Sequence, residues 1–266
     1  MIQAKHQILT RNVSQLVTFR MKQAVQSWRF RVFLICLVVT PIATLAGEEM
    51  LPLKIDYPAH AVGTAVEQPG TNVECYDGLN PPATLFVPVG TTNVALYKPV
   101  TSSTGTTNIY ANIVARKGDK TAISAGGPTN LNWITGGDKT SPLVRDMNFL
   151  QVGFRKQYVQ IDLGGEVNIY AVAVWHCYFI RNEVFNNVVV QICDKPGFQE
   201  NVSTIFNNDA RNELGLGAGK DRLYCETRWG KLIDAHGIKG RYVRLYSNGS
   251  NLGKVNYYLQ VEVYGK

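Results

Sequence analysis

From residue 93 to residue 266 the chain reads as a series of β-strands with no helix between them. In QYVQIDL (157–163), Val159, Ile161 and Leu163 alternate with polar side chains, the pattern of a strand with one buried face. Residues 168–177, NIYAVAVWHC, are apolar on both faces, which is typical of a central strand. Clusters of Gly, Asn, Asp and Pro separate four further strand-like segments: 187–193, 202–207, 240–246 and 257–265. Because no stretch keeps helical periodicity over three turns, we predict an all-β fold, an antiparallel β-sandwich.

Outside its N-terminal segment the chain is close to electrically neutral. The full sequence has 27 Lys and Arg against 20 Asp and Glu, a formal charge of +7. Six of the basic residues and none of the acidic ones lie in residues 1–46, which leaves 21 basic against 20 acidic residues, or +1. Nucleic-acid binding depends on an excess of Lys and Arg. The charge therefore argues against a nucleic-acid partner.

The N-terminal segment, up to Ala46, has the composition of a signal peptide. Arg29 and Arg31 precede an apolar run over residues 32–45, and the small side chains of Thr44 and Ala46 suit a signal peptidase. We expect cleavage after Ala46. The mature chain is then exported, to an extracellular, cell-surface or periplasmic location.

A membrane anchor is the competing interpretation of residues 1–46. The apolar run is shorter than the roughly 20 residues that a spanning helix needs, and it contains Pro41. We therefore expect a leader that is removed. The stretch before the run is long when counted from Met1, and Met21 as the true start gives a leader of ordinary length.

Residues 47–92 are expected to form a linker or an irregular arm ahead of the domain. Six of the eleven prolines lie in this segment, which sustains neither a helical nor an alternating pattern. Proline at this density removes backbone donors and stiffens the chain into extended segments. The domain itself, residues 93–266, is long enough for one sizeable core.

The cysteines outside the leader are interpreted as packing residues or disulfides. They are Cys75, Cys177, Cys193 and Cys225. An exported chain can oxidise them, and four cysteines allow three pairings among which the sequence does not choose. They show no CxxC spacing and few histidines accompany them, which disfavours a zinc site.

Several segments of the domain stand in a familiar order. They are NVALYKPVTSS (93–103), ITGGDKTS (134–141), QYVQIDLG followed by IYAVAVWH (157–176), and RYVRLYSNG leading to the terminal VEVYGK (241–266). Together they resemble the discoidin family, also called the coagulation factor V/VIII type C domain. The resemblance implies a jelly-roll sandwich of the galactose-binding-like superfold, usually a non-catalytic module that binds sugars, phospholipid headgroups or proteins through loops at one end. Since proteins of this superfold bind many different ligands, the resemblance does not identify the ligand of this chain.

The resemblance also implies a structural calcium ion (Ca2+). In sugar-binding relatives the ion braces the loop similar to GGDKTS against a carboxylate of the last strand. Gly137, Asp138 and Thr140 match the loop, and calcium requires hard oxygen ligands. In the last strand Gln260 stands at the position of the usual glutamate and Glu262 is the next acidic residue, so the ion is expected to be loose or absent. A simple Asx-type turn at Asp138 is the alternative.

The sequence gives little support to an enzyme. The glycine-rich GLGAGKDR fails as a phosphate loop, because Leu214 replaces its first glycine and Asp221 its Ser or Thr. His176 and Cys177 are neighbours on a predicted strand, so their side chains point to opposite faces and do not form a nucleophile and base pair. We expect a non-catalytic protein.

Two connections carry side chains that suit a sugar ligand, whose hydroxyls need both donors and acceptors. If each strand reverses direction, connections 178–187 and 207–221 lie at the same end of the sandwich. The candidate ligand-binding residues on or beside them are His176, Tyr178, Arg181, Asn186, Asn207, Asn208 and Asp209. For Tyr178 and Arg181 an ordinary place on the loop surface is the alternative. We expect binding to depend most on Arg181.

Other conspicuous residues are assigned structural roles. Trp175 shares a face with apolar neighbours and is expected in the core. Arg244 is expected to pair across strands with a carboxylate, Glu262 or Asp162. The strand count places the connection 247–256 at the opposite end from the other two, so we interpret its Asn248 as a turn residue.

The expected function is binding of carbohydrate, for example a glycan of a cell surface. An adhesion or protein-interaction domain that binds another surface protein is the alternative, with the proline-rich arm as a spacer. Binding to membrane lipid is the weakest of the three, because it needs apolar loop tips beside basic residues. In the sequence only Phe179 and Ile180, next to Arg181, form such a tip.

Overall fold

The structure is a computed structural model that describes residues 48–58, 73–74, 81–104, 109–111, 131–139, 150–176 and 183–266. The predicted leader lies outside these ranges. The strands are β1 (Met50–Pro52), β2 (Val73–Glu74), β3 (Phe86–Pro88), β4 (Thr92–Asn93), β5 (Val100–Ser102), β6 (Ile109–Ala111), β7 (Leu150–Phe154), β8 (Lys156–His176), β9 (Val189–Cys193), β10 (Ser203–Asn207), β11 (Leu223–Tyr224), β12 (Lys231–Asn248) and β13 (Val255–Gly265). One 3-10 helix, η1 (Leu131–Thr135), accompanies them. Within the described ranges no helix has the length and apolar character of a membrane span.

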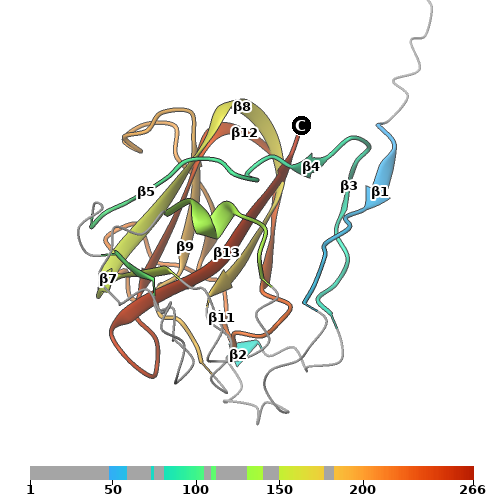
Figure 1. Ribbon diagram of the computed structural model, residues 1–266. Coiled ribbons are helices and arrows are strands. Elements are labelled where there is room, and N and C mark those ends of the chain that lie inside the picture. The colour runs from blue at the N-terminus through green and yellow to red at the C-terminus, as the bar shows by residue number, and fades with distance from the viewer. Residues whose placement is uncertain are drawn as a thin grey trace, which may run out of the picture. The chain divides into compact units, whose positions relative to one another are not determined.

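Two long strands, β8 and β12, run through both layers of the sandwich. Residues 242–248 of β12 pair with residues 156–162 of β8, and residues 231–240 pair with residues 167–174. Both strands curve over together at one end of the molecule (Figure 1). At the bend of β8, Gly164 has a φ of +85°, a conformation that glycine adopts more readily than any other residue. The two strands predicted at 157–163 and 168–177 are therefore the two halves of one bent strand.

Each half of the long strands recruits its own neighbours. In the first layer β9 pairs with residues 242–246 of β12, β10 pairs with β9, and β5 pairs with the beginning of β8. In the second layer β13 pairs with the end of β8, and β7, β6 and β4 complete the sheet. These pairings are all antiparallel; the short β2 and β11 pair in parallel. The predicted all-β antiparallel sandwich is confirmed.

The core lies between the two layers. Val159 and Ile161 of the first layer meet Val172 and Val174 of the second in one buried cluster, which also contains Val243 of β12. These are the side chains whose alternation with polar residues predicted the strands. Burial of the apolar face of each sheet against the other holds the layers together.

The outer face of the second layer is covered by the proline-rich segment. β1 pairs with β3, and Leu53, Ile55 and Tyr57 pack against a second apolar cluster that contains Trp175 and Tyr264. Residues 48–266 form one compact unit. The described part of the arm is therefore packed against the sandwich and does not act as a free spacer. Trp175 is fully buried, as expected, but under this arm and not between the sheets.

The predicted partner of Arg244 is corrected. Arg241 forms the two-pronged ion pair with Asp162, with Nε to Oδ1 at 2.7 Å and Nη2 to Oδ2 at 2.8 Å, and it holds the pKa of that carboxyl below its usual range. Arg244 instead donates to the amide oxygen of Gln160 and stacks over the Phe198 ring, 4.0 Å from its centroid. A buried guanidinium can be satisfied by neutral acceptors and aromatic faces, which a search for carboxylates does not anticipate.

The two cysteines that the structure describes, Cys193 and Cys225, differ in their bonding. Cys225 is part of a disulfide whose second cysteine lies outside the described residues. Cys193 is buried and free, with Sγ 3.3 Å from the carbonyl oxygen of Glu200. A scheme that pairs all four cysteines outside the predicted leader is therefore excluded, and Cys193 acts as a packing residue.

Candidate functional site

Three connections meet at the end of the sandwich opposite the bend of β8 and β12, which we call the loop end. Residues 183–188 precede β9, residues 208–222 follow β10, and residues 249–254 join β12 to β13. The backbone N–H of Asn186 donates to the carbonyl of Gly249 at 2.8 Å, and the N–H of Asn208 donates to the carbonyl of Val188 at 3.1 Å. The three connections are thus bonded to one another through their backbones.

The connection after β12 was expected at the opposite end, and this prediction is wrong. The strand count missed residues 231–240, the first half of β12, which carry the chain from the loop end up to the bend. The second half brings it back down, so the connection emerges beside the other two. Because each strand reverses the direction of the chain, missing this half-strand places every later connection at the wrong end of the sandwich.

A pocket of about 400 Å³ opens between these connections. We call it the asparagine pocket, and its lining residues are Asn186, Asn187, Asn208, Ala210, Arg211, Glu213, Leu223 and Asn248. The amides each combine a donor and an acceptor on one side chain. Nη1 of Arg211 lies 3.9 Å from Oε1 of Glu213, and both side chains are largely exposed. The charges at the rim are therefore of both signs. The pocket is therefore polar without a strong net charge.

Asn208 is the pocket residue whose hydrogen-bonding groups are least satisfied. Its Oδ1 accepts from the N–H of Val188 at 2.7 Å, which fixes the side chain. Its Nδ2 is buried and has no hydrogen-bond partner among the described residues. An unpaired buried donor costs about 1–3 kcal/mol, and a ligand hydroxyl that reached this amide would offset that cost.

The neighbours of Asn208 shape the loop. The carboxylate of Asp209, 1% exposed, accepts from the N–H groups of Glu213 at 3.0 Å and Leu214 at 2.8 Å. The side chain of Asn207 accepts from the N–H of Asp209 at 2.9 Å and donates to the carbonyl of Gly217 at 3.0 Å. Their polar atoms are committed within the loop, so Asn207 and Asp209 are corrected from ligand contacts to residues that hold Asn208 in place.

His176, another predicted ligand contact, is also corrected. It is the last residue of β8, it is fully buried, and its ring stacks on Phe185 with centroids 4.3 Å apart. Its Nδ1 is hydrogen-bonded to Glu226 at 2.8 Å. A polar residue at the end of a strand can be drawn into the core by a distant partner, and His176 and Glu226 are 50 positions apart.

Of the remaining predicted contacts, Asn186 lines the asparagine pocket together with Asn208. Tyr178 and Arg181 lie outside the described residues, so their roles stay predictions. Sequence reasoning missed Asn187, Glu213 and Asn248. The signal for Asn248 was the alternation of buried Ile233 and Ala235 with exposed Asp234 and His236, which marks the missed half-strand.

A buried acidic group joins two of these connections to the segment after β11 (Leu223–Tyr224). Ser250 donates to Glu183 Oε1 at 2.8 Å, and the N–H of Glu226 donates to the carbonyl of Glu183 at 2.8 Å. Burial raises the pKa of Glu183 to about 6, and the negative charge of Glu226 adds to the effect, while the Ser250 hydrogen bond and His176 oppose it. A carboxyl with a raised pKa destabilises the folded state once it ionises.

Replacement of Glu183 by Gln is therefore expected to stabilise the protein above pH 6. In the wild type this carboxyl is neutral in both the folded and the unfolded state below its ordinary pKa of 4.5. The contribution of the neutral carboxyl to the stability of the folded state is lost as the pH rises through about 6. The difference corresponds to about 2 kcal/mol at pH 7.5. Urea unfolding from pH 4 to pH 8 measures it, with Glu200→Gln, an exposed glutamate, as control. Parallel pH profiles of wild type and Glu183→Gln would contradict the assignment.

The residues expected to bind calcium do not fit the ion. Gln260 Oε1 accepts from the N–H of Gly137 at 3.1 Å, and the carboxylate of Glu262 accepts from Lys139 and from the Tyr264 hydroxyl. Asp138 is exposed, and Thr140 lies outside the described residues. Among the residues that the structure describes, no group of three or more His, Cys, Asp or Glu could hold a metal ion. The side-chain oxygens of Gln260 and Glu262 are therefore used in hydrogen bonds and an ion pair within the protein.

No protein-family model matches the chain, and no curated protein matches it. Among solved structures, a chitosan-binding module of a chitosanase/glucanase from Paenibacillus sp. IK-5 is similar at 15% identity and a TM-score of 0.42, over 65% of this chain and 99% of that one. A family 89 glycoside hydrolase from Clostridium perfringens is similar at 12% identity and a TM-score of 0.40, over 66% of this chain and 15% of that one. The CBM32 of AlyQ, in complex with 4,5-unsaturated mannuronic acid, is similar at 14% identity and a TM-score of 0.32, over 44% and 76%.

Proposed function

We propose that the chain is an exported, non-catalytic carbohydrate-binding module whose ligand occupies the asparagine pocket. The observation that carries the proposal is that Asn186 and Asn208, from two connections, and Asn248, the last residue of β12, line one pocket in which the Asn208 Nδ2 donor lacks a partner among the described residues. A sugar hydroxyl both donates and accepts, and amides match it in both roles. The similar structures include modules named for carbohydrate binding, and this proposal does not depend on them.

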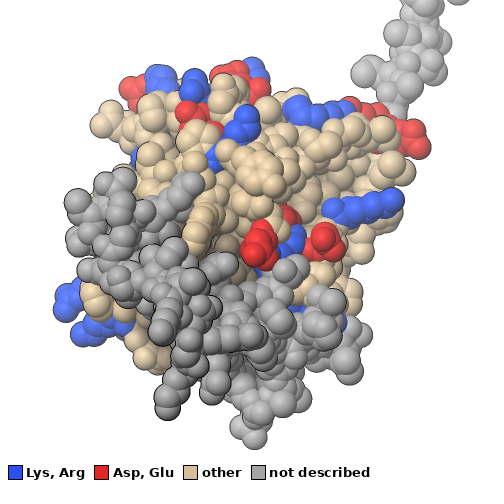
Figure 2. All heavy atoms as spheres, in the orientation of Figure 1, with Lys and Arg blue, Asp and Glu red and all other residues tan. Residues whose placement is uncertain are grey.

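The charge of the molecule supports a neutral or weakly charged ligand. On the described part of the face shown in Figure 2, Lys and Arg are interspersed with Asp and Glu, and most of the described residues are neither. Arg211 and Glu213 at the pocket rim likewise carry opposite charges. A polyanionic ligand would be bound through a basic surface, so a glycan array with neutral and acidic glycans is the appropriate first screen.

The array is probed with the purified protein lacking the predicted leader. Binding to at least one class of glycan, competed by the free sugar, supports the proposal. If no glycan on the array is bound, carbohydrate binding is rejected. A partner on the surface of the producing cell that is retained in the presence of free sugars would instead favour the adhesion alternative.

Replacement of Asn248 by Ala is expected to weaken glycan binding without altering stability. The Asn248 side chain lines the pocket and makes no hydrogen bond to another described residue, so its loss removes a ligand contact alone. One hydrogen bond contributes about 0.5–1.5 kcal/mol, which corresponds to a loss in affinity of roughly 2- to 10-fold. Isothermal titration with the best glycan of the array measures it. Asn168→Ala, an exposed asparagine at the bend of β8, is the matched control and should bind as the wild type does.

A second candidate function, binding to an anionic membrane surface, is favoured by one observation. Phe154 and Leu252 at two neighbouring turns of the loop end are 64% and 52% exposed. The turns also carry Arg155 and Lys254, and the N–H of Arg155 donates to the carbonyl of Lys254 at 2.7 Å. Exposed apolar side chains beside basic ones suit insertion at a lipid interface. Co-sedimentation with anionic vesicles that is lost in Phe154→Ser, Leu252→Ser would support this function, and absence of co-sedimentation would reject it.

A further inference from the structure

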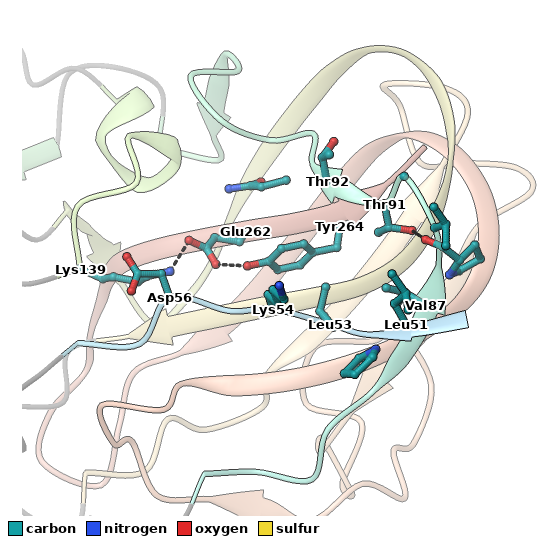
Figure 3. Close-up of a pocket in the computed structure, with 15 residues that line it drawn as sticks. Leu51, Leu53, Lys54, Asp56, Val87, Thr91, Thr92, Lys139, Glu262 and Tyr264 are labelled. Atoms are coloured by element: carbon teal, nitrogen blue, oxygen red, sulfur yellow. Dashed lines mark hydrogen bonds and ion pairs between the residues drawn. The ribbon is translucent and has the colours of Figure 1, made fainter. Parts of the chain in front are cut away.

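A buried ion pair lies under the arm, between the turn after η1 and the last strand. Lys139 donates to Oε1 of Glu262, and the Tyr264 hydroxyl donates to Oε2 of Glu262 at 2.6 Å (Figure 3). Lys139 is 3% exposed and Glu262 is 5% exposed. The three residues line a cavity of about 590 Å³ whose other wall is formed by β1 and β3. Both oxygens of the Glu262 carboxylate are therefore taken by groups of the chain itself.

The ammonium of Lys139 is held from a second side by an aromatic ring. Its Nζ lies 4.5 Å from the centroid of the fully buried Trp175 ring. Asp56 of the arm lies beside it in Figure 3. A carboxylate and an aromatic face are the two surroundings that best compensate a desolvated ammonium. The positive charge of Lys139 is therefore compensated by residues of the protein itself.

The same turn is fixed to β13 a second time. Gln260 Oε1 accepts from the N–H of Gly137 at 3.1 Å, and Lys139 follows two residues later with its ion pair to Glu262. These two contacts span 123 positions in the sequence. They join the turn and strand that the discoidin resemblance implies to be bridged by calcium.

We propose that Lys139 takes the place of that calcium ion, so that the turn after η1 is fastened to β13 by a charge built into the chain and not by a metal. A divalent cation placed at Glu262 would face the ammonium of Lys139 at close range, and like charges repel strongly in a site shielded from water. Stability and ligand binding are then indifferent to calcium. This inference is independent of which ligand the asparagine pocket takes.

The first experiment compares thermal unfolding of the purified protein in excess calcium and in EGTA. The account predicts the same melting temperature in both. An ion bound to the folded state alone, at a concentration about 100 times its dissociation constant, would raise the melting temperature by roughly 5–10 °C. Such a rise, abolished in Glu262→Gln, would overturn the proposal.

The second experiment tests the lysine directly. Lys139→Met keeps the stem and removes the charge, and it should lower the melting temperature by about 6–20 °C because it leaves the buried Glu262 carboxylate unpaired. The double variant Lys139→Met, Glu262→Gln should recover part of the loss, since no unpaired charge remains. Lys239→Met is the matched control, because Lys239 pairs with Glu166 at the surface. If Lys139→Met melts like the wild type, or if the double variant is no more stable than the single one, the ion pair does not fasten the turn.

Discussion

A chain that begins at Asn93 is expected to lose most of its stability, although residues 93–266 contain every strand of the two layers except half of the short β4. Without the arm, Trp175, Leu259 and Tyr264 on the outer face of the second layer become exposed. Tyr57 of the arm alone approaches the Trp175 ring edge-on, with centroids 6.4 Å apart. Burial of one tryptophan is worth up to roughly 4–6 kcal/mol, against a total stability of about 5–15 kcal/mol for a typical domain.

The measurement is urea unfolding of two truncated chains. Removal of residues 1–46 should leave a cooperatively folding protein, and removal of residues 1–92 should give one that unfolds at far lower urea concentration or aggregates through its exposed apolar face. Equal unfolding midpoints for the two chains would show that the arm is a spacer after all.

Replacement of Val243 by Asp is expected to abolish folding. Val243 is fully buried in β12 and pairs with Ile161 of β8 on one side and Ile192 of β9 on the other. A carboxylate at this position would be buried without a partner, which costs several kcal/mol even when it is protonated. Far-UV and near-UV circular dichroism of the purified variant report the loss of fold.

The control for this substitution is Val89→Asp, because Val89 is 44% exposed. Surface substitutions of this kind usually change stability by no more than about 0.5 kcal/mol. If Val243→Asp keeps the near-UV spectrum and melting temperature of the wild type, then Val243 does not lie in the core between the two layers.

The layers and the core could be predicted because they depend on local alternation. Val159, Ile161 and Leu163 alternate with polar residues, and the structure buries all three. The first half of β12 escaped because its apolar alternation is short: Lys231 takes the buried position before Ile233, where it pairs with Glu74 at 2.5 Å. A paired lysine inside a strand is indistinguishable in sequence from an exposed one.

The remaining features depend on contacts between distant residues, which no local pattern encodes. His176 is buried because Glu226 meets it, and Lys139 is buried because Glu262 and Trp175 do. The arm was interpreted as a linker or irregular segment because prolines are dense in it, yet proline also suits an extended segment laid on a sheet face. Asn186 and Asn208 could be foreseen at one end, whereas Asn248 required the missed half-strand.

The measurement that tests the central claim most directly follows the side-chain amides of the pocket by NMR. The isotope-labelled protein is titrated with the glycan bound most strongly on the array. The account predicts that the side-chain NH2 resonances of Asn186, Asn208 and Asn248 shift in saturable fashion with one dissociation constant, while that of Asn168 at the bend stays fixed. Saturable shifts confined to residues outside the asparagine pocket, with those three amides unmoved, would contradict it.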